Sequence, residues 1–159
     1  MKMKLLMRGP GRGARPVDLG ARAALVAGGL LVVWTSYIHF HLWVETDGYR
    51  SIPTIGPLFL LQSIAGVLLG LLTIALRRVV MAALGIGFAL ATMAGFLISV
   101  EHGLFGFKDS WSAPFAQQAF AIEIATVVVL LFAGVLSLAG SAPASRTGTA
   151  PTSSPSAGA

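Results

Sequence analysis

The chain has no cysteine among its 159 residues, and this absence excludes disulfide bonds, thiolate metal sites and thiol redox chemistry. Asparagine is also absent, whereas alanine, glycine and arginine are abundant, a bias that indicates a GC-rich, bacterial genome. Charged residues are scarce, at 11% of the chain, against about 25% in soluble domains. With 55% hydrophobic residues, this shortage of charge predicts a membrane protein.

The net charge of +5 raises the question of nucleic-acid binding. The charged residues fall at the ends of apolar segments, however, and not in a basic patch interleaved with aromatic residues. That distribution does not fit a nucleic-acid interface. We therefore expect the lipid bilayer, and no nucleic acid, among the partners of this chain.

Four apolar runs are long enough to cross a bilayer, which takes about 20 mostly apolar residues. They cover approximately residues 22–44, 57–76, 79–100 and 114–139. Only Arg77 and Arg78 separate the second run from the third, so these two runs should form a tight helical hairpin. The expected fold is all-α, a polytopic membrane protein with a four-transmembrane-helix bundle and short loops.

The segments at both ends of the chain differ in composition from this transmembrane domain, residues 21–140. Residues 1–20 are basic, and residues 141–159 are rich in Ala, Ser, Thr, Pro and Gly, which predicts a disordered tail. Of the 11 Lys and Arg residues, only Arg50 and Lys108 lie in the loops opposite the termini. The positive-inside rule then places both termini in the cytoplasm and the protein in the inner membrane as a multi-pass protein.

Each predicted helix carries its small and polar residues in one stripe, at 100° per residue. The stripes consist of Gly28, Thr35, Ser36, His39 and Thr46; Gln62, Ser63, Gly66, Gly70 and Thr73; Gly85, Thr92, Gly95, Ser99 and His102; and Glu123, Thr126, Gly134 and Ser137. The simplest interpretation is helix packing, since small residues let helices approach closely in lipid and polar ones hydrogen bond across the interface.

The outer part of these stripes suggests more than packing. Glu123 lies about two turns into the fourth run, at the depth of His39 and Gln62. A charged carboxylate there costs about 2.5–3.5 kcal/mol, so Glu123 must be protonated or paired, with His39 and Gln62 as the expected partners. Glu101 and His102, at the outer end of the third run, could cover the same site. We expect these five residues to line one polar pocket that opens outward.

Several chemistries suit such a pocket. His39, His102 and Glu123, with Glu101 as a further ligand, could bind a metal ion such as zinc, copper, iron or nickel; the simpler alternative is a His–Glu hydrogen bond between two helices. His39 and His102 could instead be axial haem ligands, a layout that resembles four-helix membrane cytochromes. A histidine and a carboxylate walled by aromatic rings would also suit a quinone and exchange its protons.

The function expected from these features is that of a binding or accessory subunit in a membrane complex. One alternative is a membrane redox protein or enzyme that binds a metal, haem or quinone through His39, Glu123 and His102. The other is a proton-coupled transporter of small solutes, which with four spans would work as a homo-oligomer. Catalytic and non-catalytic roles both stay open at this level.

Overall fold

The computed structural model describes residues 7–11, 15–45 and 48–140. They form four long helices, α2 (Pro16–Val44), α3 (Ile55–Leu76), α4 (Val79–Glu101) and α5 (Ala116–Ala139), and a 3-10 helix, η1 (Tyr49–Ser51). These described residues contain no strand, only an isolated bridge between Leu104 and Phe107. All four long helices have the length and composition to cross a membrane, so the predicted all-α, multi-pass fold is confirmed.

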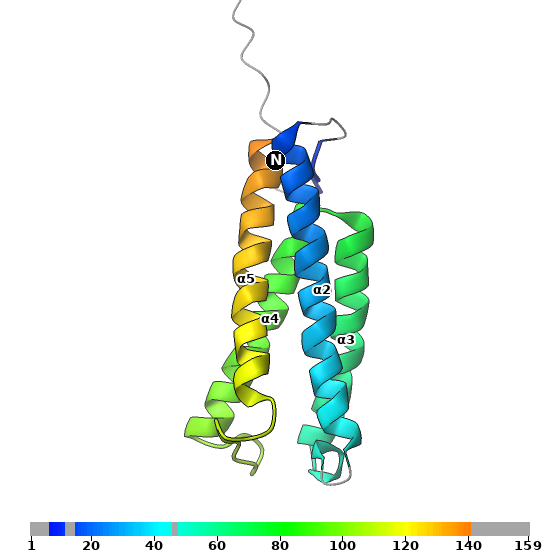
Figure 1. Ribbon diagram of the computed structural model, residues 1–159. Helices are drawn as coiled ribbons and strands as arrows, with labels where there is room; N and C mark the ends of the chain where they lie inside the picture. The colour runs from blue at the N-terminus through cyan, green and yellow to red at the C-terminus, as the bar shows by residue number, and fades with distance from the viewer. Residues whose placement is uncertain (1–6, 12–14, 46–47, 141–159) are drawn as a thin grey trace, which may run out of the picture.

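The helices run alternately up and down and form a bundle (Figure 1). The start of α2, the turn between α3 and α4, and the end of α5 lie together at one end, which carries Arg8, Arg15, Arg22, Arg77 and Arg78. We call this the basic end. The opposite end, which carries η1 and residues 102–115, is the loop end.

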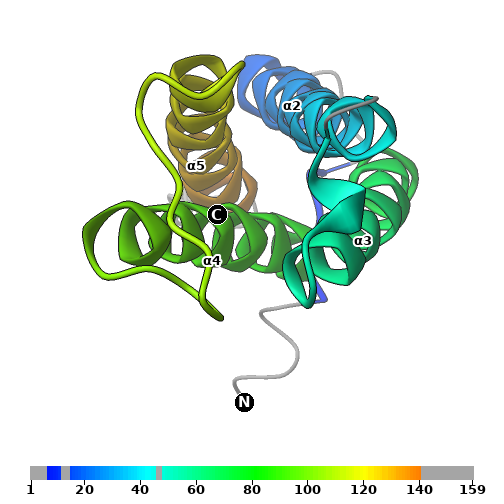
Figure 2. The same cartoon turned by 90° about the horizontal axis from the view of Figure 1, so that it is seen from below.

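Packing between the helices is uneven. Helix α2 packs extensively against both α3 and α5, whereas α3 and α4 contact each other over a much smaller surface. The two helices meet at their connecting turn and diverge toward the loop end, as both views show (Figures 1 and 2). This divergence leaves space between α3 and α4 in the half of the bundle nearest the loops.

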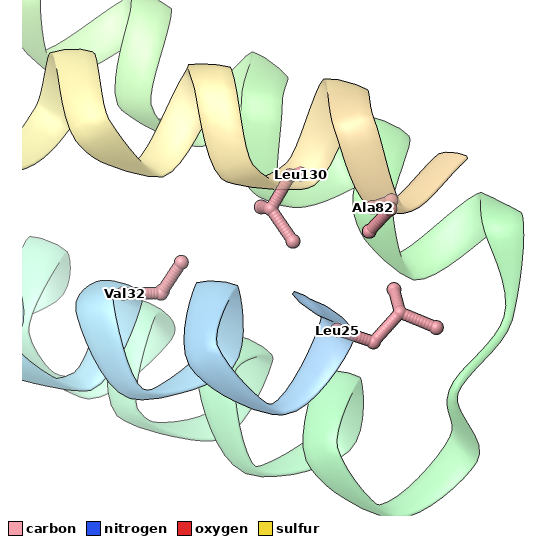
Figure 3. Packing of buried hydrophobic residues seen from close by; sticks show 5 residues of the cluster. Leu25, Val32, Ala82 and Leu130 are labelled. Atoms are coloured by element: carbon pink, nitrogen blue, oxygen red, sulfur yellow. The ribbon is translucent and has the colours of Figure 1, made fainter. Parts of the chain in front are cut away.

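Buried hydrophobic side chains fill the half of the bundle nearest the basic end. Leu25 and Val32 of α2, Leu130 of α5 and Ala82 of α4 point toward one another (Figure 3). The buried polar residues include Thr35, Ser36, Ser63, Thr73, Ser99, Glu123, Thr126 and Ser137, so the interpretation of the polar stripes as inward-facing is confirmed for these positions. Large apolar residues such as Leu61 and Val135 are exposed on the outside, where lipid would cover them.

Helix α2 begins at Pro16, earlier than the start of the expected first span at residue 22. Proline suits the first turn of a helix, and the nearby Asp18 is buried although it is charged. Its carboxylate accepts hydrogen bonds from Gly11 N and Arg15 Nε, each at 2.9 Å. Arg15 also donates to Gly140 O, so Asp18 and Arg15 join the start of α2 to the end of α5.

The expected disordered tail, residues 141–159, lies outside the described residues. Parts of the N-terminal segment, residues 1–6 and 12–14, do so as well.

Candidate functional site

A large cavity lies between α3 and α4 in the half of the bundle nearest the loop end. Its volume is about 400 Å³. The walls are mostly apolar, and its polar lining comes from His39, Gln62, Thr92, Ser99 and Asp109. Leu58 and Leu61 line it from α3 while 38% and 61% exposed, so its rim reaches the outer surface of the bundle. The cavity is therefore accessible from the side that would face lipid.

A small cavity, of about 40 Å³, lies beside the large one. Glu123 and Tyr49 line only this small cavity, whereas His39, Thr92 and Asp109 line both. This volume accommodates roughly one or two water molecules. The expected single pocket is thus two adjoining cavities, with His39 in the wall they share.

His39 is held by its own helix. Its exposed fraction is 9%, and its Nδ1 atom lies 2.9 Å from Thr35 O, one turn earlier. A carbonyl oxygen can only accept a hydrogen bond, so Nδ1 carries the hydrogen, and in the neutral ring Nε2 is left as an acceptor. The ring also packs against Phe59 of α3, with 5.1 Å between the ring centroids. Backbone and aromatic contacts together fix the direction of the imidazole.

Glu123 has a different partner from the one expected. Its exposed fraction is 2%, and its Oε1 accepts a hydrogen bond of 3.1 Å from Thr35 Oγ1. Thr35 therefore contacts both ionisable groups, Glu123 through its hydroxyl and His39 through its carbonyl oxygen. No direct hydrogen bond joins His39 to Glu123 within the described residues, although both line the small cavity.

Gln62 lines the large cavity, as His39 does, but not the small one. Its Nε2 donates to Thr92 Oγ1 at 2.6 Å, and that hydroxyl in turn donates to Phe88 O at 3.0 Å. This chain of hydrogen bonds links α3 to α4 across the cavity. Gln62 is therefore a neighbour of His39 but lines no cavity with Glu123.

Glu101 and His102 do not join the other three residues. Both are exposed at the end of α4 and line neither cavity. No group of three His, Asp or Glu residues within the described part of the chain could hold a metal ion. The structure thus does not support a metal site of His39, His102 and Glu123, or His39 and His102 as paired haem ligands. The physical reason is the divergence of α4 from α3, which carries its last turn away from the bundle axis.

Residues of the two loops cover the cavities instead. Asp109 N donates to Ser99 Oγ at 3.2 Å, which keeps the loop after α4 close to its own helix. Tyr49 OH lies 3.3 Å from Asp109 Oδ1, a long hydrogen bond that links the two loops at this end. The Tyr49 ring stacks on Phe59 at 4.2 Å between centroids. Figure 2 shows these two loops from the loop end.

The sequence interpretation missed Tyr49, Ser99 and Asp109 as part of the site. Their signal was weak, because the contact joins two loops that are distant in sequence. A tight turn at residues 103–107 aims the second loop back over the bundle. Gly103 and Gly106 adopt positive φ angles of 82° and 80° in this turn, which glycine allows without strain, and Phe105 between them has a φ of 52°. Burial, and then the charge of Asp109, raise the pKa of Tyr49, so the phenol stays protonated and able to donate.

Replacing Tyr49 by phenylalanine should loosen the two loops that cover the cavities, without changing their shape. A long hydrogen bond is worth at most about 1 kcal/mol, so amide hydrogen exchange of residues 104–110 should become up to about five times faster. Tyr37→Phe is the matched control, because Tyr37 is 58% exposed and no hydrogen bond of its hydroxyl occurs among the described residues. Equal exchange rates in the two variants would show that the link to Asp109 does not hold the loops.

Comparison with known proteins does not assign the chain to a family. No protein-family model, no curated protein and no solved structure matches it.

Proposed function

We propose that this protein binds a small lipophilic molecule that enters the large cavity from the bilayer through the gap between α3 and α4. The cavity itself is the observation that supports this function. Its volume of about 400 Å³ falls in the range of small-molecule sites, about 300–1,000 Å³. Apolar walls with a few converging polar groups are also typical of such sites.

The route of entry supports a ligand from the membrane. Leu58 and Leu61 at the rim face outward, whereas the loops with Tyr49 and Asp109 cover the site from the loop end. A molecule dissolved in lipid would meet the rim directly. We also propose that the basic end faces the cytoplasm and that the cavity lies in the outer half of a bacterial inner membrane, because basic residues favour the cytoplasmic side.

One observation favours a proton-linked form of this function. His39 and Glu123 line the small cavity, and His39 also lines the large one. A ligand beside His39 could therefore exchange protons with Glu123 through water, as a quinone would require. This role is compatible with an accessory subunit, since such a subunit can hold a lipophilic cofactor for a larger complex.

The proposal can be tested with a tryptophan near the cavity. Trp111 packs against Phe96, with 4.8 Å between ring centroids, and Phe96 lines the large cavity. In a Trp34→Phe, Trp43→Phe background, Trp111 is the only tryptophan. Bromododecane added to this protein in lipid nanodiscs should quench Trp111 fluorescence and reach saturation, because a bound bromine atom quenches a nearby indole.

Two glycines of α4 provide a matched pair of variants. A Cβ atom at Gly95 or at Gly87 would meet no atom within 4 Å, but only Gly95 lines the large cavity. Gly95→Phe should fill the cavity and abolish most of the saturable quenching, whereas Gly87→Phe should leave it unchanged. Equal quenching in both variants would mean that the probe binds Trp111 from the lipid side, and the proposal would be wrong.

A further inference from the structure

The polar atoms of the large cavity restrict the head group that it can accept. No Lys or Arg is among its lining residues, so a phosphate or carboxylate head would have no cation to pair with. The side chain of Asp109 adds a further acceptor. These features disfavour the head groups of anionic lipids.

Most hydrogen-bond donors in the cavity are already used. Thr92 Oγ1 donates to Phe88 O, and Ser99 Oγ donates to Phe107 O at 3.4 Å. Gln62 uses one of its amide hydrogens on Thr92. The cavity therefore offers mainly acceptors to a ligand.

His39 supplies the best-placed acceptor. Nδ1 donates to Thr35 O, and no other described residue hydrogen bonds to the imidazole. Nε2 of the neutral ring thus keeps a free lone pair on a side chain that is more than nine-tenths buried in the bundle and lines the cavity. No buried side-chain nitrogen or oxygen atom of the described residues lacks a hydrogen-bond partner, so the unpaired Nε2 is accessible, and a donor group of a ligand in the cavity that His39 lines can reach it.

We infer that the ligand is a single-tailed amphiphile without a negative charge, whose hydroxyl group donates a hydrogen bond to His39 Nε2 while its tail lies between α3 and α4. This inference rests on the proposed function, since it names the ligand class of the same cavity. Long-chain alcohols and the reduced, hydroxyl form of a quinone share this chemistry. A quinone in its oxidised form has only acceptors and lacks the required donor.

The test compares probes that share a tail and differ in the head. Bromododecane, bromododecanol, its methyl ether and bromododecyl phosphate each carry bromine at the far end of the tail. Quenching of Trp111 in nanodiscs gives the apparent affinity of each. Bromododecanol should bind about five times more tightly than its methyl ether, the gain typical of one hydrogen bond, and more tightly than the phosphate probe.

A His39→Leu variant identifies the acceptor. In this variant the alcohol and its methyl ether should bind equally. The probe series uses His39 intact, so the inference stays testable if His39→Leu does not fold. An ether that binds as tightly as the alcohol, or a phosphate probe that binds more tightly than the alcohol, would overturn the head-group inference. Failure of bromododecane itself to bind the protein with His39 intact would instead overturn the proposed function.

Discussion

Replacing Gly70 by alanine is expected to lower the free energy of unfolding by about 1–3 kcal/mol, the usual cost of overpacking. A Cβ atom at Gly70 would lie 2.7 Å from Gly29 O and 2.6 Å from Val33 Cγ2. Gly29 O belongs to the backbone of α2, so relief requires that α2 and α3 move apart. Because α2 packs extensively on α3, that movement would weaken much of the bundle.

Unfolding by SDS titration, followed by circular dichroism, measures this effect. Gly87→Ala is the matched control, since a Cβ atom at Gly87 would meet nothing within 4 Å. Its free energy of unfolding should equal that of the wild type or exceed it slightly, because alanine favours a helix more than glycine does. If the two variants unfold at the same SDS fraction, the close approach of α2 and α3 at Gly70 is not important for stability.

Replacing Glu123 by alanine should lower the free energy of unfolding by about 2–3 kcal/mol, mainly through the cavity that it leaves in the bundle. Loss of the hydrogen bond from Thr35 adds a smaller amount, about 0.6 kcal/mol for an average bond between membrane helices. When the helices separate in lipid, the carboxyl group of Glu123 also faces hydrocarbon, which is costly. The native carboxyl therefore favours the folded bundle.

Two further variants separate the causes of this effect. Glu123→Gln keeps the volume and an acceptor for Thr35, so its loss should stay under about 1 kcal/mol. His41→Ala should lower the free energy of unfolding by about 1 kcal/mol or less, because the His41 side chain is 37% exposed; it pairs with the exposed Glu45 at 3.1 Å and contacts the rings of Tyr37 and Phe115. If Glu123→Ala and His41→Ala have the same free energy of unfolding in the SDS titration, the buried carboxyl group has no structural role.

Much of this fold follows from the sequence because lipid leaves few choices. Apolar runs long enough to cross a bilayer must become helices that satisfy their own backbone, and the polar stripes then have to face inward. The same reasoning correctly places Glu123 and His39 in the interior at one depth. Residue spacing along single helices is sufficient for these conclusions.

The tilt of a helix does not follow from the spacing of residues along the sequence. Glu101 and His102 were expected in the pocket because a helical wheel assumes parallel axes, whereas α4 diverges from α3 and leaves both residues exposed. The partner of Glu123 was also missed, since a threonine was counted as a packing residue and not as a donor. Contacts between loops, such as Tyr49 with Asp109, depend on the tertiary structure and have no periodic signal at all.

The two ends of the bundle differ in their freedom to move. At the basic end, only Arg77 and Arg78 connect α3 to α4, and Asp18 with Arg15 joins the start of α2 to the end of α5. Toward the loop end, α3 and α4 are joined by the hydrogen bond from Gln62 to Thr92 and by the long hydrogen bond between the loops, from Tyr49 to Asp109. A change of a few degrees in the tilt of α4 would widen the entrance between Leu61 and Gly95 at the expense of the hydrogen bond from Gln62 to Thr92, while the packing around Leu25 and Leu130 stays intact.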